Sequence, residues 1–544
     1  MMLWPHYALA TALISSTALA TQKVLVGGKE NPLNSNIYKL AIEALEEWHV
    51  PGLSIAIVDG EDTWAAGYGN ATLPSTPVTP STLFYGGSTT KAFTAAIVSL
   101  LIDSGAYHPS LSWQTPISQL IRDDFVLQPE YAWAQEHLTL EDLLSHRTGF
   151  ARHDKSLASH HHQGGDSSEE EGEEKASARS LARSLRHLPM VTEPRTTYRY
   201  CNLMYLVASH AIQTLTRTGL GALMRDWIWG PLGMHSTYFS LEEALAAPEH
   251  LAAGYYWDYD AGDGGFARVP YMGLREASGA GAVVSNVLDY ARWVRCLVDE
   301  AAPLSRRGHG ALRTPRIVPA GGAQGYDGEM SYALGWRVNT YKGHRVFTHS
   351  GGMEAYGADV WFFPELRYGI VTMGNTAVTS NFVGRMVAWR LINDRLGVPE
   401  EQRYDWHSQF EQSLEDLRGQ FDKAEDKLYP DRAQPPLPRA LPLEEYTGTY
   451  FHPAYRNLTI ALSDAAEQLR AVRKDSVWKM TFDFGRVSGE FWVIYIDMLN
   501  TPNKLNGQLA KAEFVIGPSG KVDKLIVEFL EEGSEGIITF DKIM

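Results

Sequence analysis

The first three quarters of the chain alternate between two hydrophobic patterns. Residues 38–48 (YKLAIEALEEW) place apolar side chains at helical spacing, whereas residues 51–69 read as two short strands around a tight Asp-Gly turn. Residues 88–105 form a long helical run that ends in glycine, and strand-like segments return at 345–375. Strands at both ends of one region, with helices between them, predict an α+β domain built on an antiparallel sheet with flanking helices.

The pattern changes after residue 400. Residues 406–428 place large apolar side chains on one face of an amphipathic helix, and the proline-rich stretch 430–442 that follows favours an extended linker. The last hundred residues are short alternating segments, such as LTIAL and EFWVIYIDM, separated by turn formers. We therefore predict a main domain at 31–400, a helix and linker at 401–442, and an all-β, barrel-like module at 443–544.

Residues 155–180 interrupt the main domain with a polar, charge-blocked segment that has almost no large apolar side chains. Such a segment cannot bury enough surface to order itself, so we predict a mobile surface insertion. It contains His160 to His162 close to Glu169 to Glu171, which are metal-binding residue types, but a metal site requires a fixed geometry that this segment does not provide. The sequence therefore predicts no metal ion and no organic cofactor.

Residues 7–20 are apolar and end in Ala-Leu-Ala, the small-residue pattern that signal peptidases cleave. We predict that residues 1–20 are a signal peptide and that the chain is secreted; the alternative is a buried N-terminal helix, because the usual positive charge at the start is missing. Secretion would make Asn70 and Asn457, both in Asn-x-Thr triplets, candidates for glycosylation. No other segment approaches the roughly 20 apolar residues of a membrane span.

The net charge argues against some classes of partner, and the cysteine content argues against a disulfide framework. The formal net charge of −16 argues against nucleic acid and anionic membranes, because both reward clustered lysine and arginine. The two cysteines, Cys201 and Cys296, lie in apolar, helix-like surroundings and are too few for a disulfide framework, so we expect small buried side chains.

Ser88 and Lys91 are the first candidates for chemistry. On a helix, positions three apart share a face, so the hydroxyl and the amine can meet, and the helix N-terminus adds positive potential where an oxyanion would form. Burial would favour a neutral lysine that acts as a base, whereas a nearby anion would keep it charged. The same spacing recurs at Ser476 and Lys479 without a comparable setting, so the spacing alone has low specificity.

Two further motifs contain side chains that can take part in catalysis. Tyr200 and Asn202 open a helical run, where a phenol can shuttle a proton and an amide can position a substrate. His349 closely precedes Gly351 and Gly352, which let a chain approach a ligand closely. Taken singly, the first motif also fits an ordinary helix start and the second a strand-end turn.

In this order, the three motifs resemble the serine β-lactamase-like (penicillin-recognising) superfamily, particularly its class C β-lactamase, D-aminopeptidase and esterase branch. The resemblance spans about residues 38–400 and implies a β-lactamase/transpeptidase-like fold with a helical subdomain. Residues 446–450 (YTGTY) are similar to the opening of the lipocalin-like domain often appended to such enzymes. Other stretches that resemble the branch are LLSHRTG at 143–149, PLGM at 231–234, SGAG from 278 leading to Ser285, and YALGW at 332–336.

The resemblance implies a role for each motif residue. Ser88 would attack an acyl carbon, while Lys91 and Tyr200 would manage its proton. Asn202 would contact Lys91 and the acyl side of the substrate. The backbone N–H groups of Ser88 and Gly352 would form an oxyanion hole. The substrate-binding wall would consist of Asn202, His349, Gly351 and Gly352.

His349 stands where lactamases usually carry lysine. With an ordinary pKa of about 6.5 a histidine is mostly neutral at pH 7 and clamps a carboxylate poorly. We therefore expect hydrolysis of an ester or amide, as in esterases or D-aminopeptidases, rather than of penicillins. The same acyl-enzyme would serve an acyltransferase, and a catalytically inactive binding protein is the remaining alternative. The expected partner is a small-molecule or peptide-like acyl substrate, and the β module would shape the cleft or assemble a homo-oligomer.

Overall fold

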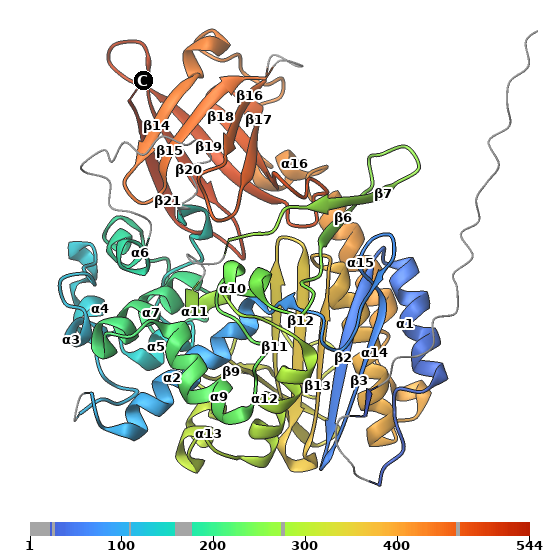
Figure 1. The fold of residues 1–544 in the computed structure, drawn as a ribbon. Helices are drawn as coiled ribbons and strands as arrows, with labels where there is room; N and C mark the ends of the chain where they lie inside the picture. Colours follow the sequence, from blue (N-terminus) through green and yellow to red (C-terminus); the bar gives the residue numbers. More distant parts are fainter. Residues whose placement is uncertain are drawn as a thin grey trace, which may run out of the picture.

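The computed structural model of the chain describes residues 22–23, 28–107, 110–157, 177–273, 278–463 and 468–543. A domain of sheet and helices forms the lower part of the molecule in Figure 1, and a β-barrel from the C-terminal residues lies on top of it. This architecture confirms the predicted α+β domain and all-β module. Residues 1–20 and His160 to His162 lie outside the described residues, so the signal peptide and secretion stay predictions.

A nine-stranded antiparallel sheet with the order β1-β3-β2-β13-β12-β11-β10-β9 forms the centre of the lower domain, and β4 pairs with β3. Strands from both ends of the domain meet in its middle, because β13 pairs along its whole length with β2. The strands are β1 (Gln22–Lys23), β2 (Gly52–Asp59), β3 (Asp62–Thr72), β4 (Thr76–Pro77), β9 (Ser331–Tyr332), β10 (Arg337–Tyr341), β11 (His344–Met353), β12 (Tyr356–Phe363) and β13 (Tyr368–Gly374).

Helices cover both faces of this sheet, so every residue of β2 is buried. Successive side chains of a strand point to opposite faces. Ile55 accordingly belongs to the core that includes α1 (Ser35–Glu47) and α14 (Thr379–Leu396), whereas Val58 belongs to the core that includes α12 (Val287–Asp299). The continuous hydrophobic run of β2 is therefore that of a central strand.

A helical subdomain lies beside the sheet and is centred on two long helices, α2 (Thr90–Ser104) and α7 (Asn202–Thr216). Gly105 ends α2 in the left-handed conformation at φ 60°, which glycine adopts without steric cost. The other helices are α3 (Ile117–Leu120), α4 (Ala132–His137), α5 (Leu140–Leu144), α6 (Ala178–Ser184), α8 (Leu220–Met224), α9 (Gly230–Leu232), α10 (Leu241–Ala246), α11 (Ser278–Gly281) and α13 (Arg306–Arg313). Two strand pairs, β5 (Phe84–Tyr85) with β8 (Val284–Ser285) and β6 (Gly254–Asp258) with β7 (Gly265–Val269), complete the domain.

The C-terminal module is a closed antiparallel barrel, because β14 pairs with both β15 and β21. Its interior is filled by aromatic side chains packed around Phe514, including Tyr446, Tyr450 and Trp492. A closed barrel of this kind fits a lipocalin-like module. The strands are β14 (Gly448–His452), β15 (Arg456–Leu462), β16 (Leu469–Arg473), β17 (Met480–Ser488), β18 (Phe491–Met498), β19 (Gln508–Ile516), β20 (Val522–Phe529) and β21 (Ile537–Lys542).

The connection between the two parts contains two helices rather than the single helix expected at 406–428. α15 (Trp406–Gly419) packs against the main domain through Trp406 and Phe410, and α16 (Ala424–Leu428) packs against the barrel. The apolar positions are spaced as one helix would have them, but they contact two different domains, so the helix ends between them.

The barrel also contacts the main domain at residues that the sequence assigned to a mobile insertion. Lys155 and Ser156 are buried, and the Lys155 Nζ lies 3.0 Å from Glu531 and 3.1 Å from Glu535 of the barrel. Leu157 is also buried, and its carbonyl accepts hydrogen bonds from the barrel. α6 begins at Ala178. The predicted boundaries 155–180 are therefore too wide at both ends. Lys155 is fixed by ion pairs with residues far along the chain, and α6 already begins before residue 180.

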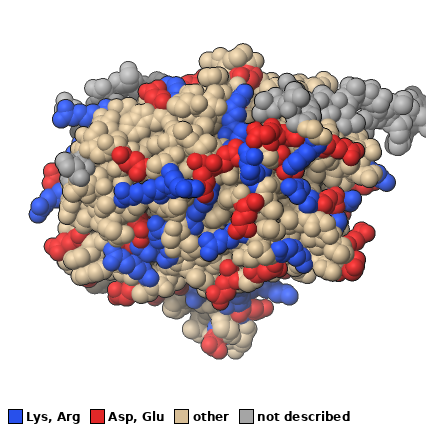
Figure 2. Space-filling model, turned by 90° about the horizontal axis from the view of Figure 1, so that it is seen from below, with Lys and Arg blue, Asp and Glu red and all other residues tan. Residues whose placement is uncertain are grey.

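The face opposite the barrel carries charges of both signs. Figure 2 shows lysine and arginine interleaved with aspartate and glutamate there, without a continuous basic area. Among the described residues, no helix combines the length and apolarity needed to span a bilayer.

Candidate active site

Ser88 lies in the 3₁₀ turn η1 (Gly87–Thr89), directly before α2. Lys91 occupies the first turn of α2 and is fully buried, and its Nζ lies 3.1 Å from the Ser88 Oγ. The structure thus brings together the two side chains whose spacing predicted a contact.

The Lys91 amine is surrounded by acceptors but by no carboxylate within the described residues. It donates hydrogen bonds to the Asn202 Oδ1 at 2.7 Å and to the carbonyl of Ala280 at 2.9 Å. Burial holds the pKa of Lys91 well below its ordinary value, and Arg152 lowers it further, while Asp154 opposes the shift. A neutral amine has two N–H bonds for these two acceptors, and its lone pair is then left for the proton of Ser88.

Tyr200 also lies beside Ser88 and Lys91. Its ring lies 4.8 Å from the Lys91 Nζ, and burial raises the pKa of its phenol to about 12 although a hydrogen bond with Ser88 opposes this shift. The phenol therefore stays protonated at neutral pH and can give a proton to a leaving group. The structure places Ser88, Lys91, Tyr200 and Asn202 in one cluster, as the motifs predicted.

The glycines of β11 serve two different purposes. A Cβ at Gly351 would lie 2.0 Å from the carbonyl oxygen of Gly86, so only glycine lets β11 run against the turn that carries Ser88. A Cβ at Gly352 would meet nothing within 4 Å. Gly351 is therefore required for close packing, whereas Gly352 opens onto the cavity beside Ser88.

His349 lines the same cavity but is buried rather than a surface residue. Its Nε2 lies 3.0 Å from the Tyr332 hydroxyl and its Nδ1 lies 2.8 Å from the Ser350 carbonyl. Burial holds the pKa of His349 well below its ordinary value, and the charge of Arg337 adds to the effect. His349 is therefore a neutral, fixed wall and not a cationic clamp.

The other family-like stretches assemble around these residues. His146 packs against Tyr200 at 4.2 Å between ring centroids, and its Nδ1 accepts the backbone N–H of Cys201 at 3.1 Å. Gly335 has φ +76°, and a Cβ there would come within 2.9 Å of the Lys91 carbonyl. These stretches therefore act on the site through packing.

A cavity of about 440 Å³ extends from Ser88 to the barrel. The barrel supplies one wall of it, which no motif in the sequence indicated. Trp478 belongs to the Ser476–Lys479 stretch that duplicated the Ser-x-x-Lys spacing; Ser476 is buried there, and its hydroxyl donates to the Leu157 carbonyl at 3.0 Å. The barrel residues of this wall include Val477, Trp478, Met480, Met498, Glu531 and Glu532.

Arg337, at the start of β10, is a cavity residue that the motifs missed by one position, since it directly follows the YALGW stretch. Its hydrogen bond to the Ser350 Oγ is long at 3.5 Å, and its buried Nε has no partner. It forms no ion pair in the described part of the chain. Arg385, which also lines the cavity, lies 3.2 Å from Asp359. Arg337 is therefore the cavity cation that remains available to an anionic ligand.

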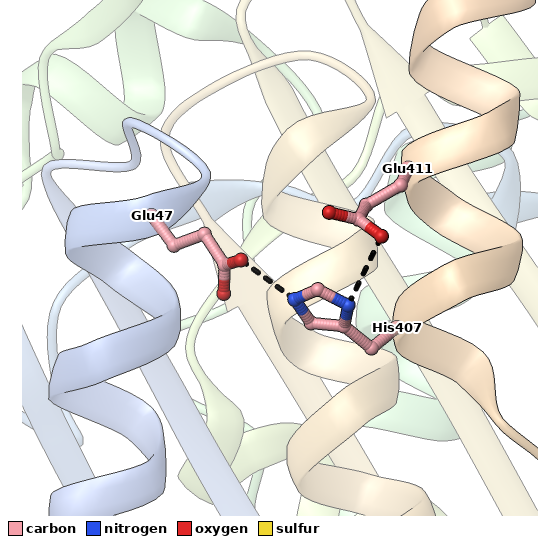
Figure 3. Close-up of side chains that lie close together, drawn as sticks. All are labelled: Glu47, His407 and Glu411. Atoms are coloured by element: carbon pink, nitrogen blue, oxygen red, sulfur yellow. Dashed lines mark hydrogen bonds and ion pairs between the residues drawn. The ribbon is translucent and has the colours of Figure 1, made fainter.

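One group of side chains in the described ranges has the composition of a metal site. Figure 3 shows Glu47 of α1 and Glu411 of α15 on either side of His407, at 2.6 and 3.4 Å. Both glutamates are exposed, and none of the three residues lines the cavity. Hydrogen bonding to Glu47 raises the pKa of His407, so the group is explained as an ion pair that links α15 to α1.

Comparison with known families agrees with this geometry. The model of the family described as Beta-lactamase matches residues 39–392. The chain belongs to the β-lactamase family. A second model, described as a domain of unknown function (DUF3471), matches residues 432–540.

Relatives of this β-lactamase-family protein include hydrolases. The unguisins hydrolase ungD' of Aspergillus campestris is 41% identical over 491 residues, which cover 90% of this chain and 88% of that protein. The D-aminopeptidase of Brucella anthropi is 25% identical over 230 residues, which cover 42% of this chain and 40% of that protein. These relatives support the classification of the protein as a serine hydrolase.

A solved structure shares the fold over most of the β-lactamase-family chain. The octameric penicillin-binding protein homologue from Pyrococcus abyssi aligns with a TM-score of 0.56 and 19% sequence identity. The alignment covers 93% of this chain and 99% of that one, so it includes the barrel as well as the sheet domain.

The two glycines of β11 should respond differently to substitution. Gly351→Ala should destabilise the protein by about 3 kcal/mol, because the methyl group overlaps the Gly86 carbonyl. Gly352→Ala should change the free energy of unfolding by less than about 0.5 kcal/mol while slowing acylation, because its methyl group enters the cavity. Thermal melting and acylation rates measure both effects, and equal loss of stability in the two variants would contradict the assignment.

The acylation rate of this β-lactamase-family enzyme should reflect the state of Lys91. A neutral amine is required, so the rate should fall as the pH drops through the lowered pKa of Lys91 and be constant above it. Because the pKa of Tyr200 is about 12, no loss is expected between pH 8 and 10 from the phenol. The pH profile of kcat/KM tests this. An acid limb centred near 10.5, the ordinary value for lysine, would contradict the lowered pKa of Lys91, and a rate that falls as the amine loses its proton would argue against a neutral base.

Proposed function

We propose that this protein hydrolyses an amide through an acyl-enzyme on Ser88. Neutral Lys91 takes the Ser88 proton as Oγ bonds to the carbonyl carbon. The backbone N–H groups of Ser88 and Gly352 receive the oxyanion. The tetrahedral intermediate then collapses, the amine leaves with the Tyr200 proton, and the Lys91 ammonium reprotonates the phenol. Water attacks the resulting ester and releases the acid, which restores Ser88.

The observation that carries this proposal is the contact of the Ser88 hydroxyl with a buried amine that has no carboxylate partner in the described residues. Burying an amine without a carboxylate partner costs free energy, and groups perturbed in this way are concentrated at functional sites. A binding protein that only retained the fold would have no need to keep this arrangement. The geometry thus favours catalysis over binding alone.

The substrate class is inferred from the relatives and from the lining of the cavity. The relative with 41% identity is named for hydrolysis of unguisins, and we propose unguisins or compounds of the same kind as substrates of this chain. Apolar side chains such as Met353, Phe382 and Trp478 line the cavity together with the cation Arg337. A peptide-like substrate that has apolar groups and one anionic or carbonyl group near Arg337 matches this lining.

The nucleophile is tested by intact-mass spectrometry after brief exposure to unguisins, phenyl esters and D-amino acid amides. Wild type should gain the mass of one acyl group, and Ser88→Ala should gain none and lose more than about 10³-fold in turnover. Ser476→Ala is the matched control, because Ser476 has the same spacing to a lysine but lacks the amine contact; it should still be acylated. An adduct on Ser88→Ala would disprove the assignment. Repeating the assay with an added amine separates hydrolysis from acyl transfer.

Arg337 is expected to recognise the anionic group. Arg337→Gln should lower kcat/KM by about 10- to 100-fold for a substrate with a free carboxylate, but little for the matched carboxamide, because a charge-assisted hydrogen bond is lost only in the first case. Arg385→Gln is the control, since Arg385 lines the same cavity but is engaged with Asp359. Equal effects of Arg337→Gln on both substrates would show that Arg337 does not select the charge.

A further inference from the structure

The orientation of the Asn202 amide decides whether Lys91 meets an acceptor or a donor. Asn202 presents Oδ1 to the Lys91 amine at 2.7 Å and donates from Nδ2 to both carboxylate oxygens of Asp154, at 3.1 and 2.9 Å. An ionised carboxylate only accepts hydrogen bonds. A flipped amide would turn its oxygen toward that carboxylate, so Asp154 holds the acceptor end of Asn202 toward Lys91.

Asp154 is itself held in place by an arginine. It is 3% exposed, and its Oδ2 accepts hydrogen bonds from the Nε and Nη2 of Arg152, at 3.0 and 2.7 Å. The two residues flank His153, which has the left-handed conformation at φ 49°, and Asp154 begins η3 (Asp154–Ser156). This segment belongs to no sheet and no long helix, so its position depends on the partners of its charged side chains.

The barrel provides those contacts. Arg152 lies 3.0 Å from Glu531 and 2.9 Å from Glu532, both in the connection between β20 and β21. Although burial opposes it, Arg152 and Lys155 hold the pKa of Glu531 below its ordinary value, so this carboxylate stays ionised at neutral pH. A continuous chain of charged contacts therefore leads from the barrel to the amide beside the catalytic amine.

We propose that Glu531, Arg152 and Asp154 are positioning residues through which the barrel fixes the Asn202 amide for catalysis. The proposal rests on the proposed Ser88 acyl-enzyme. Adhesion between domains alone is a weaker explanation, because buried ion pairs are often no more stabilising than apolar contacts of the same size. An adhesive role would also not require this series of charged contacts to end at the Asn202 amide, which contacts Lys91.

A double-mutant cycle tests the proposal with the full-length protein. Asp154→Asn removes the charge at nearly constant shape and lets the Asn202 amide flip. Acylation by a phenyl ester should slow at least about 10-fold. The rate is measured on the plateau of the pH profile, where Lys91 is fully neutral, so that a shift in the pKa of Lys91 does not contribute. In an Asn202→Ala background the same substitution should cost less than about 3-fold, because the residue it acts through is gone. The same factor in both backgrounds would overturn the proposal.

A second comparison keeps the test decisive if Asp154→Asn folds poorly. Glu531 and Glu535 both bind Lys155, but only Glu531 also contacts Arg152. Glu531→Gln should reduce the acylation rate at least about 5-fold, and Glu535→Gln should leave it within about 2-fold even if the melting temperature falls. Equal kinetic losses that follow the melting temperatures would mean that the contacts only hold the domains together.

Failure of this inference is separable from failure of the proposed function. If the wild type forms no Ser88 adduct with any donor, the acyl-enzyme itself is wrong. If the wild type is acylated but the cycle shows independent effects, the acyl-enzyme stands and the positioning role is wrong.

Discussion

The burial of one lysine amine is the constraint on which the site depends. Within the described residues Lys91 has no carboxylate partner, and its hydrogen bonds go to a side-chain amide, a backbone carbonyl and Ser88. Desolvation disfavours the charged form, and the surrounding acceptors suit an amine with two hydrogens and one lone pair. Asn202 of α7 and Ala280 of α11 each provide one acceptor, so these two helices converge on Lys91 of α2.

The approach of β11 to η1 is the second constraint. Gly351 lets the strand pass the Gly86 carbonyl, so the strand edge reaches the turn that carries Ser88. The central position of β2 and β13 keeps this arrangement rigid, because both strands are buried along their whole length. The resulting cavity has its nucleophile on a helix start and its opposite wall on a sheet.

The barrel completes the site. Trp478 and its neighbours line one wall of the cavity, while Glu531 and Glu535 hold the segment around Lys155. A cavity that is lined partly by a second domain can select its substrate through residues outside the catalytic motifs.

Features that have a local cause could be predicted from the order of the residues. Alternation and helical spacing predicted the sheet, the helices and the all-β module, and three short motifs named Ser88, Lys91, Tyr200, Asn202 and the glycines of β11. The tertiary structure alone decided the contacts of Lys155 with Glu531 and Glu535, which are 376 and 380 residues apart in sequence, and with them the course of the segment after Asp154. Charged residues in a polar stretch look alike whether they face water or a carboxylate on another domain, because their pairing depends on domain packing and leaves no periodic pattern in the chain.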